Sequence, residues 1–316
     1  MVMKLGLHPE LKDMLMEYRK ERSFNAKEWI DKKVEATNEY FALHGLSGAC
    51  INVSGGIDSA VTLALLKKAS MVPGSPLKKV LGIAQPIHST ATIQDRAYVA
   101  GKAAGVEIIT VDQSSLEDRL SSIVIGELKG DLLPKPDKVR FARGQLRSYM
   151  RTPVLYFVAQ MISAQGFPCV CVGTGNFDED GYLRYFCKAG DGVADIQLIA
   201  DLHKSEVFAV ARALEGTVPD SIIEAKPSAD LWEGQSDEDE LGVSYDFVEL
   251  YTGYMMKGSR ITGFEERIGE LSEEARAEFL RKAKLVEYHH KRNAHKAHFP
   301  LNINVLPLPA SEVEHK

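Results

Sequence analysis

Short apolar runs alternate with longer segments of helical periodicity through the middle of the chain. The apolar runs occupy residues 48–53, 78–86, 106–112 and 168–174. Helical spacing of apolar positions fills the intervals at residues 58–70, 92–105 and 145–166. Strands rich in valine and isoleucine that alternate with helices are typical of a parallel sheet covered on both faces. We therefore expect a doubly wound, mostly parallel α/β fold of Rossmann-like type.

The two ends of the chain follow a different pattern. The first 45 residues carry apolar positions at helical spacing, such as Leu11, Met14, Leu15 and Tyr18, and predict helices. Two polar, turn-rich segments, 131–144 and 225–242, predict irregular loops. We expect one domain over residues 1–316. Its parts would be a helical N-terminal segment, a nucleotide-binding core and a C-terminal tail, at residues 1–45, 46–298 and 299–316.

Composition excludes several classes of protein. The 316 residues include 38 basic and 44 acidic side chains, and a net charge of −6 argues against a general nucleic-acid-binding surface. No run approaches the roughly 18 apolar residues that span a membrane, and the charged N-terminus does not resemble a secretory signal. The spacing of the four cysteines is not that of a Cys-x-x-Cys site, which favours buried thiols in a reducing, cytoplasmic compartment. These cysteines are Cys50, Cys169, Cys171 and Cys187.

A glycine-rich turn follows the first predicted strand and leads into a helix. It reads Ser-Gly-Gly-Ile-Asp-Ser over residues 54–59, without the lysine that ends a Walker-type loop. A plain helix N-terminus would explain the glycines alone. Asp58 would repel phosphates unless a divalent cation lay between them, so its presence predicts Mg²⁺. We expect backbone N–H groups and hydroxyls to bind phosphates here; the candidates are Ser54, Gly55, Gly56, Asp58 and Ser59.

This turn resembles the pyrophosphate loop of the adenylating ATP pyrophosphatases, which implies an adenine nucleotide alpha hydrolase-like fold and transfer of AMP to a substrate. Three further segments resemble NAD synthetases in the expected order. They are "VGTGNFDEDGYLRYFCKAGDGVADIQLIADLHKSEV", "KPSADLWEGQSDEDELGVSYD" and "HHKRNAHK". We interpret the chain as a member of the NAD synthetase family.

The resemblance implies roles for individual residues. Asp58 and Glu179 would bind magnesium, and Asp191 would help position ammonia or take its proton. Thr174 and Lys204 would act on the phosphates or the acyl-adenylate, and these two complete the catalytic set with Asp191. Ser228 would add a phosphate contact. The residues implied for binding deamido-NAD are Arg147, Lys188, Asp191, Asp195, His290 and Lys291.

Some of these positions have simpler explanations, and others depart from the family pattern. Asp191 would otherwise form a turn, and Lys204 would be a surface lysine. The chain is one residue longer than the family between its magnesium glutamate and its Gly-Asp-Gly aspartate, so Asp180 competes with Glu179, which we favour. Tyr149 stands where an arginine is common. The histidine cluster could bind a metal, but a basic tail near the phosphates is the preferred interpretation; its members are His289, His290, His295 and His298.

The resemblance implies ATP-dependent amidation of deamido-NAD to NAD, with release of AMP and pyrophosphate. A glutaminase domain needs more residues than the roughly 45 that precede Cys50, so we expect ammonia as the nitrogen donor. A homodimer is expected, as in the family. The alternatives are another adenylating amidase and a non-catalytic module that senses ATP.

Overall fold

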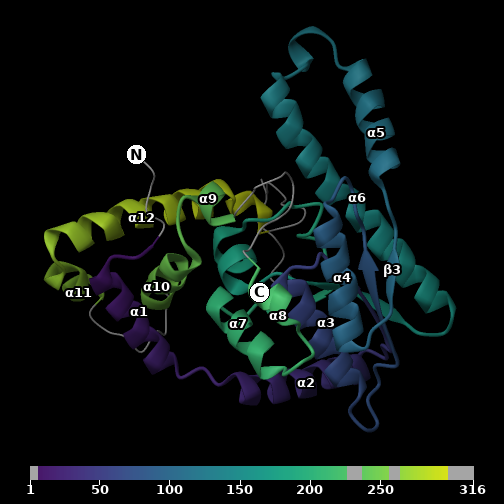
Figure 1. The fold of residues 1–316 in the computed structure, drawn as a ribbon, viewed down its shortest axis with the longest axis horizontal. Helices are drawn as coiled ribbons and strands as arrows, with labels where there is room; N and C mark the ends of the chain where they lie inside the picture. The colour runs from purple at the N-terminus through teal and green to yellow at the C-terminus, as the bar shows by residue number, and fades with distance from the viewer. Residues whose placement is uncertain (1–5, 226–236, 256–263, 298–316) are drawn as a thin grey trace, which may run out of the picture.

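A parallel five-stranded sheet forms the centre of the molecule (Figure 1). The computed structural model describes residues 6–225, 237–255 and 264–297. The strand order is β3-β2-β1-β4-β5, so the chain order reverses between β1 and β4, where α/β proteins commonly bind ligands. The predicted doubly wound sheet is confirmed. The strands are β1 (Gly48–Asn52), β2 (Lys79–Ala84), β3 (Ile108–Thr110), β4 (Cys169–Gly173) and β5 (Ile196–Gln197).

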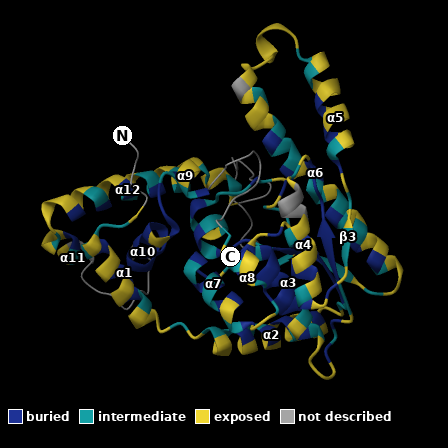
Figure 2. Ribbon diagram, in the orientation of Figure 1, coloured by how far each residue is buried: buried dark blue, intermediate teal, exposed yellow. Residues whose placement is uncertain are grey.

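Helices cover both faces of this sheet. One face carries α3 (Ile57–Ser70), α4 (Ala91–Ala104) and α7 (Lys204–Ala213), backed by α2 (Ala26–Leu43) and α8 (Asp220–Ile223). Helix α3 is enclosed between the sheet and its neighbouring helices, so most of its residues are buried (Figure 2). The other face is covered by α6 (Pro136–Ala164), whose Leu155, Ala159 and Ile162 pack against β1 and β4.

The segment at residues 131–144, predicted as an irregular loop, is mostly helical, and that prediction was wrong. Helix α6 begins at Pro136, which suits the first turn of a helix because proline lacks an N–H that would otherwise go unpaired there. The short 3-10 helix η1 (Gly130–Leu132) joins it to α5 (Ser114–Glu127). Arg143 of α6 donates to Glu117 of α5 at 2.8 Å, so polar residues stabilise this hairpin (Figure 1).

A second apolar cluster brings the N-terminal helix onto the C-terminal helices. Leu11, Leu15 and Tyr18 of α1 (Pro9–Arg22) pack with buried residues of the C-terminal third. The helices predicted for the first 45 residues are thereby confirmed. The remaining elements are the π-helix η2 (Phe177–Leu183), α9 (Asp237–Leu241), α10 (Tyr245–Met255), α11 (Phe264–Glu270), α12 (Glu273–Arg292) and the 3-10 helix η3 (Ala294–Lys296). Helix α9 falls within the other predicted loop, which was therefore wrong at its end.

Three of the four cysteines are buried as predicted. Cys50, Cys171 and Cys187 are buried free thiols, whereas Cys169, near the start of β4, is a half-buried one, and Cys50 lies opposite Cys171 on the neighbouring strand. Throughout the described ranges, none of the helices combines the length and the apolar character needed to cross a bilayer.

Candidate active site

The glycine-rich turn lies at the carboxyl end of β1 and leads into α3. Gly55 has a φ of +82°, a left-handed conformation that favours glycine. The Ser54 hydroxyl accepts a hydrogen bond from the backbone N–H of Gly56 at 3.2 Å and lies 3.2 Å from the Ser59 hydroxyl. Ser59 in turn donates to the Gly56 carbonyl at 3.0 Å. The loop is therefore preorganised at a helix N-terminus, which attracts anions.

Three charged side chains converge beside this loop. The Lys204 ammonium, on the first residue of α7, lies 2.7 Å from an oxygen of Asp58 and 2.7 Å from an oxygen of Glu179. Only 5% of the Lys204 side chain is exposed, so the three charges interact in a largely dry environment. Burial raises the pKa of Glu179 to about 7, although Lys204 opposes that rise. Burial also opposes the charge of Lys204, but Asp58 and Glu179 outweigh it and raise the pKa of Lys204.

Asn176 ties the loop to the segment that carries Glu179. Its amide nitrogen donates to Asp58 at 3.0 Å, and its side-chain oxygen accepts from the backbone N–H of Glu179 at 3.0 Å. Asn176 is fully buried. It was quoted in the motif but was not predicted as a site residue, because an asparagine in a Gly-Thr-Gly-Asn turn also reads as a helix cap. The structure makes it the bridge between the two candidate magnesium ligands.

The segment that carries Glu179 and Asp180 forms a π-helix. Gly181 donates its backbone N–H to the Asn176 carbonyl five residues earlier, the spacing that defines a π-helix. This turn places Glu179, rather than its neighbour, at the Lys204 ammonium. Asp180 lies against the backbone of Gly175, where an added Cβ would come within 2.0 Å of a carboxylate oxygen. Burial, reinforced by the charge of Asp191, raises the pKa of Asp180.

Asp191 occupies a position between η2 and α6. One of its oxygens, Oδ1, accepts from the Ser148 hydroxyl and from the backbone N–H of Cys187, both at 2.9 Å. Ser148 belongs to α6, so this helix reaches the site one residue away from the predicted Arg147. Thr174 directly follows β4 and lies at the same end of the sheet as the glycine-rich turn.

The remaining residues that were predicted to contact the substrates lie on separate elements of the fold. Asp195 accepts from Tyr156 and from the backbone N–H of Cys171, and thus holds the start of β5 to its neighbours. His290 donates from Nδ1 to the Tyr182 carbonyl, 2.7 Å away, and stacks on the Tyr182 ring. Lys188 donates to the His295 carbonyl, Lys291 is exposed beside Glu287, and Ser228 lies outside the described residues.

Side chains of the C-terminal basic run form hydrogen bonds to the backbone of the segment that follows Glu179. Asn293 donates to the Leu183 carbonyl at 3.1 Å, and Lys296 donates to the Arg184 and Phe186 carbonyls. With His290 at the Tyr182 carbonyl, three side chains from the end of α12 through η3 hold four carbonyls of the segment 182–186. This contact was not predicted, because it pairs side chains with backbone groups more than 100 residues away.

One grouping of three potential metal ligands occurs among the residues whose placement is described, and it lies away from the glycine-rich turn. It consists of His88, Glu117 and Asp118. Arg143 already bridges the two carboxylates, at 2.5 Å from Glu117 and 2.7 Å from Asp118. The Arg143 guanidinium therefore takes the place that a cation would occupy.

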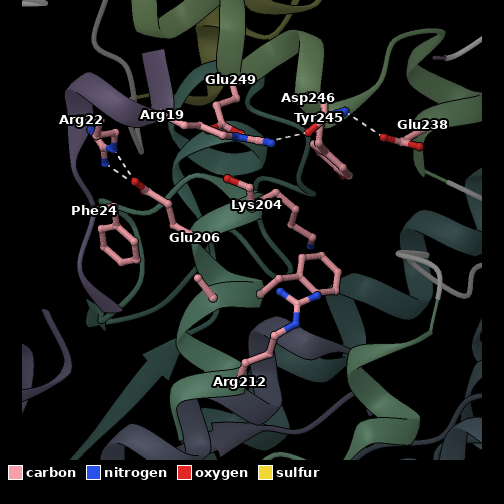
Figure 3. Close-up of a pocket in the computed structure, with 13 residues that line it drawn as sticks. Arg19, Arg22, Phe24, Lys204, Glu206, Arg212, Glu238, Tyr245, Asp246 and Glu249 are labelled. Atoms are coloured by element: carbon pink, nitrogen blue, oxygen red, sulfur yellow. Dashed lines mark hydrogen bonds and ion pairs between the residues drawn. The ribbon is translucent and has the colours of Figure 1, made fainter. Parts of the chain in front are cut away.

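A cavity of about 580 Å³ opens on the side of Lys204 that faces α1 (Figure 3). Two arginines of α1 enter it: Arg22 reaches Glu206 of α7, and Arg19 reaches Glu249 of α10. Acidic and basic side chains balance along its walls, so the cavity has no strong preference for anions or cations. Its charged members are Arg19, Arg22, Lys204, Arg212, Glu206, Glu238, Asp246 and Glu249.

The chain resembles known proteins both in sequence and in fold. A family model described as NAD synthase matches residues 29–300. The NH(3)-dependent NAD(+) synthetase of Alkaliphilus oremlandii is 35% identical over 227 residues, which cover 72% of this chain and 85% of that protein. The protein of the same name from Mycoplasmopsis pulmonis is 33% identical, with 84% of this chain and 91% of that protein covered.

Two solved structures also have a fold similar to that of this chain. The NMN synthetase from Francisella tularensis superimposes with a TM-score of 0.69 at 26% identity, covering 89% of this chain and 99% of that chain. The NH3-dependent NAD synthetase from Campylobacter jejuni gives a TM-score of 0.62 at 19% identity over 89% of this chain and 100% of that chain, a likeness of fold.

Proposed function

From the premise that this chain belongs to the NAD synthase family, we propose that it amidates deamido-NAD to NAD with ATP and ammonia, as a ligase that forms a C–N bond. The observation that carries the proposal is the pairing of Lys204 with Asp58 and Glu179 beside a preorganised glycine-rich turn. A non-catalytic ATP sensor would need the turn but not this buried charge cluster.

The first half of the reaction uses the glycine-rich turn. The nicotinate carboxylate attacks the α-phosphorus of ATP, and pyrophosphate leaves. Backbone N–H groups at the start of α3 and the hydroxyls of Ser54 and Ser59 bind the departing phosphates. Lys204 neutralises negative charge that develops at the α-phosphate, where fixed positive charge in a dry site is most effective.

Magnesium is the cation that fits the carboxylate pair. Asp58 and Glu179 supply carboxylate oxygens, the donors that Mg²⁺ prefers, and each has a second oxygen besides the one that meets the Lys204 ammonium. The residues present therefore suit this ion. When bound, magnesium would neutralise the charge that gathers on the pyrophosphate. Asn176 donates to the Asp58 carboxylate and holds the backbone of Glu179, so it ties the two ligand-bearing segments together.

The second half of the reaction involves Asp191. Ammonia attacks the carbonyl carbon of the acyl-adenylate, AMP leaves, and the attacking nitrogen loses a proton to form the carboxamide. Ser148 and Cys187 hold Oδ1 of Asp191, which leaves Oδ2 to orient ammonia and to accept that proton. Thr174, at the end of β4, contributes a hydroxyl to the adenylated intermediate.

A second candidate substrate is nicotinate mononucleotide. The solved structure of the NMN synthetase gives a TM-score of 0.69, whereas that of the NAD synthetase gives 0.62. Tyr149, at a position of α6 where the family commonly has an arginine, removes one positive charge that a dinucleotide with a second phosphate would use. The same adenylation and amidation steps would then yield NMN.

Turnover with each substrate tests the proposal and decides between the two. We expect NAD and AMP to form in equal amounts from deamido-NAD, ATP, Mg²⁺ and ammonium at alkaline pH, where uncharged ammonia is abundant. Glutamine should not replace ammonium. In competition, kcat/KM for deamido-NAD should exceed that for nicotinate mononucleotide; the reverse order would identify an NMN synthetase. If the protein bound ATP but released no AMP with either substrate, the proposed reaction would be refuted and the non-catalytic ATP sensor would be favoured.

We also propose that the protein is a cytoplasmic homodimer and that the α5–α6 hairpin forms the interface. Large apolar side chains are exposed along the hairpin, which extends beyond the sheet (Figure 2). Several large apolar side chains exposed on one pair of helices favour an interaction site. A second copy of the chain would cover it, and the side chains include Leu116, Ile123, Val124, Phe141 and Phe157.

Charge on this surface should dissociate the dimer. Ile123 and Phe157 are 56% and 66% exposed, so Ile123→Glu combined with Phe157→Glu leaves the fold intact in a monomer. We expect light scattering to show a halved mass for this variant. Leu43→Glu is the matched control, because Leu43 is 80% exposed on α2, away from the hairpin. A wild-type protein that is already monomeric at micromolar concentration would contradict the proposal.

A further inference from the structure

A buried triad of polar side chains lies behind the candidate site. The Tyr18 hydroxyl is 2.9 Å from Nε2 of His203, and Nδ1 of His203 is 2.7 Å from Oδ1 of Asp178. The exposed fractions of Tyr18, His203 and Asp178 are 7%, 1% and 0%. The edge-to-face contact with Phe177, at 5.3 Å between ring centroids, also holds the imidazole. The triad therefore has little freedom to move.

Two members of the triad are joined directly to residues of the site. Asp178 precedes Glu179 in the π-helix, and His203 precedes Lys204 at the start of α7. The second oxygen of Asp178, Oδ2, accepts from the backbone N–H of Lys204 at 2.8 Å. One carboxylate thus bridges the two segments that carry the Glu179 carboxylate and the Lys204 ammonium.

Tyr18 extends this bridge to α1. Its ring packs against Tyr254 and meets the His203 ring edge-on, and its hydroxyl occupies Nε2 of His203. The Asp178 carboxylate can only accept, so it takes the Nδ1–H of His203, and the Tyr18 hydroxyl at Nε2 fixes the orientation of the ring. The neighbouring Glu206 accepts from the backbone N–H of His203 at 2.9 Å and from Arg22 of α1.

We propose that the buried triad positions Lys204 against Glu179 for the adenylation step, and that α1 thereby acts on the rate of the reaction. The proposal rests on the proposed function for the step that it affects. Burying three polar groups among apolar side chains costs hydration free energy. An apolar cluster of the same volume would not have this cost. The triad fixes the position of Lys204 relative to Glu179. An error of 1 Å in the position of a group that acts on the phosphates can lower the rate about 100-fold.

Variants of the triad test this role. Tyr18→Phe keeps the ring and its packing but removes the hydroxyl, and we expect it to lower kcat about 3- to 10-fold with little change in KM for ATP. Asp178→Asn loses one of the two acceptor oxygens in either orientation of its amide. We expect it to lower kcat about 100-fold, in line with misplacement of a reacting group.

The double variant separates positioning from general stability. If Tyr18 acts through His203 and Asp178, then Tyr18→Phe should lower kcat no further once Asp178→Asn is present, because coupled residues are not additive. The matched control is Tyr254→Phe, which removes a hydroxyl from the same apolar cluster; its kcat should stay within twofold of wild type. Multiplicative losses, or an equal loss in the control, would overturn the proposal.

Hydrogen exchange gives a readout that does not depend on the substrate. Tyr18→Phe should increase amide exchange in the segments 177–184 and 203–206 and leave α4 and β1 unchanged, whereas Tyr254→Phe should leave all four unchanged. Unaltered exchange in 177–184 and 203–206 would overturn the proposal even if kcat fell. A wild-type protein without turnover on either substrate would refute the proposed function, while the exchange data would still decide whether the triad holds the two segments.

Discussion

Replacing Lys204 with methionine is expected to lower kcat about 10²- to 10³-fold, the effect of removing one preorganised group that stabilises transition-state charge. Methionine has a similar length and fits the buried path of the side chain, which is 5% exposed. The variant also leaves Asp58 and Glu179 facing each other without a cation. Breaking a buried pair in this way lowers the free energy of unfolding by about 3–5 kcal/mol.

Lys282 offers the control for this experiment. It is 1% exposed on α12, donates to Glu278 and to the Gly6 carbonyl at 2.9 Å each, and lies far along the chain from the glycine-rich turn. Lys282→Met should lower the thermal midpoint but leave kcat within twofold of wild type. If Lys204→Met kept wild-type kcat while losing stability, Lys204 would be a structural residue and the phosphate role would be refuted.

Asp191→Asn is expected to lower kcat with ammonia about 10²- to 10⁴-fold, the range typical of a lost general base. Both hydrogen bonds that position this side chain end on Oδ1. Asparagine keeps an oxygen there, so the change falls on the second atom, which would no longer accept a proton. The thermal midpoint should therefore change little.

Rates measured from pH 7 to 9 complete the experiment. Because the variant must rely on solvent to remove the proton, its rate should rise more steeply with pH than that of the wild type. Asp201→Asn is the control, since Asp201 is exposed and pairs with Trp29 and Lys33. A variant with wild-type kcat and an unchanged pH profile would assign Asp191 to the turn alone.

The sequence predicted the sheet well because each strand is a short apolar run with a helix between it and the next. Residue type and order also located the glycine-rich turn and singled out Asp58, Glu179 and Lys204, which the structure brings together as an ion-paired cluster. The loop predicted at residues 131–144 failed for a physical reason: its polar side chains suit a helix that projects from the sheet, where Arg143 pairs with Glu117. The polar composition of this segment was wrongly taken to indicate an irregular loop.

Contacts that depend on three-dimensional proximity could not be predicted. Nothing local in the sequence joins Tyr18 to His203, which are 185 residues apart, or the Lys296 ammonium to the Arg184 carbonyl. The sequence offered both Glu179 and Asp180 at this position and could not show which of them reaches Lys204. Only the π-helical turn decides that Glu179, and not Asp180, reaches the Lys204 ammonium.

The packing of α1 against α10 and α12 also constrains how the protein folds during synthesis. Leu11, Leu15 and Tyr18 emerge from the ribosome first, but the residues that cover them, such as Phe247 and Phe279, are made more than 200 positions later. Contacts of such long sequence separation form slowly, and exposed apolar surface promotes aggregation meanwhile. The nascent sheet can therefore form before the triad does, and the apolar face of α1 stays uncovered until the C-terminal third has been made.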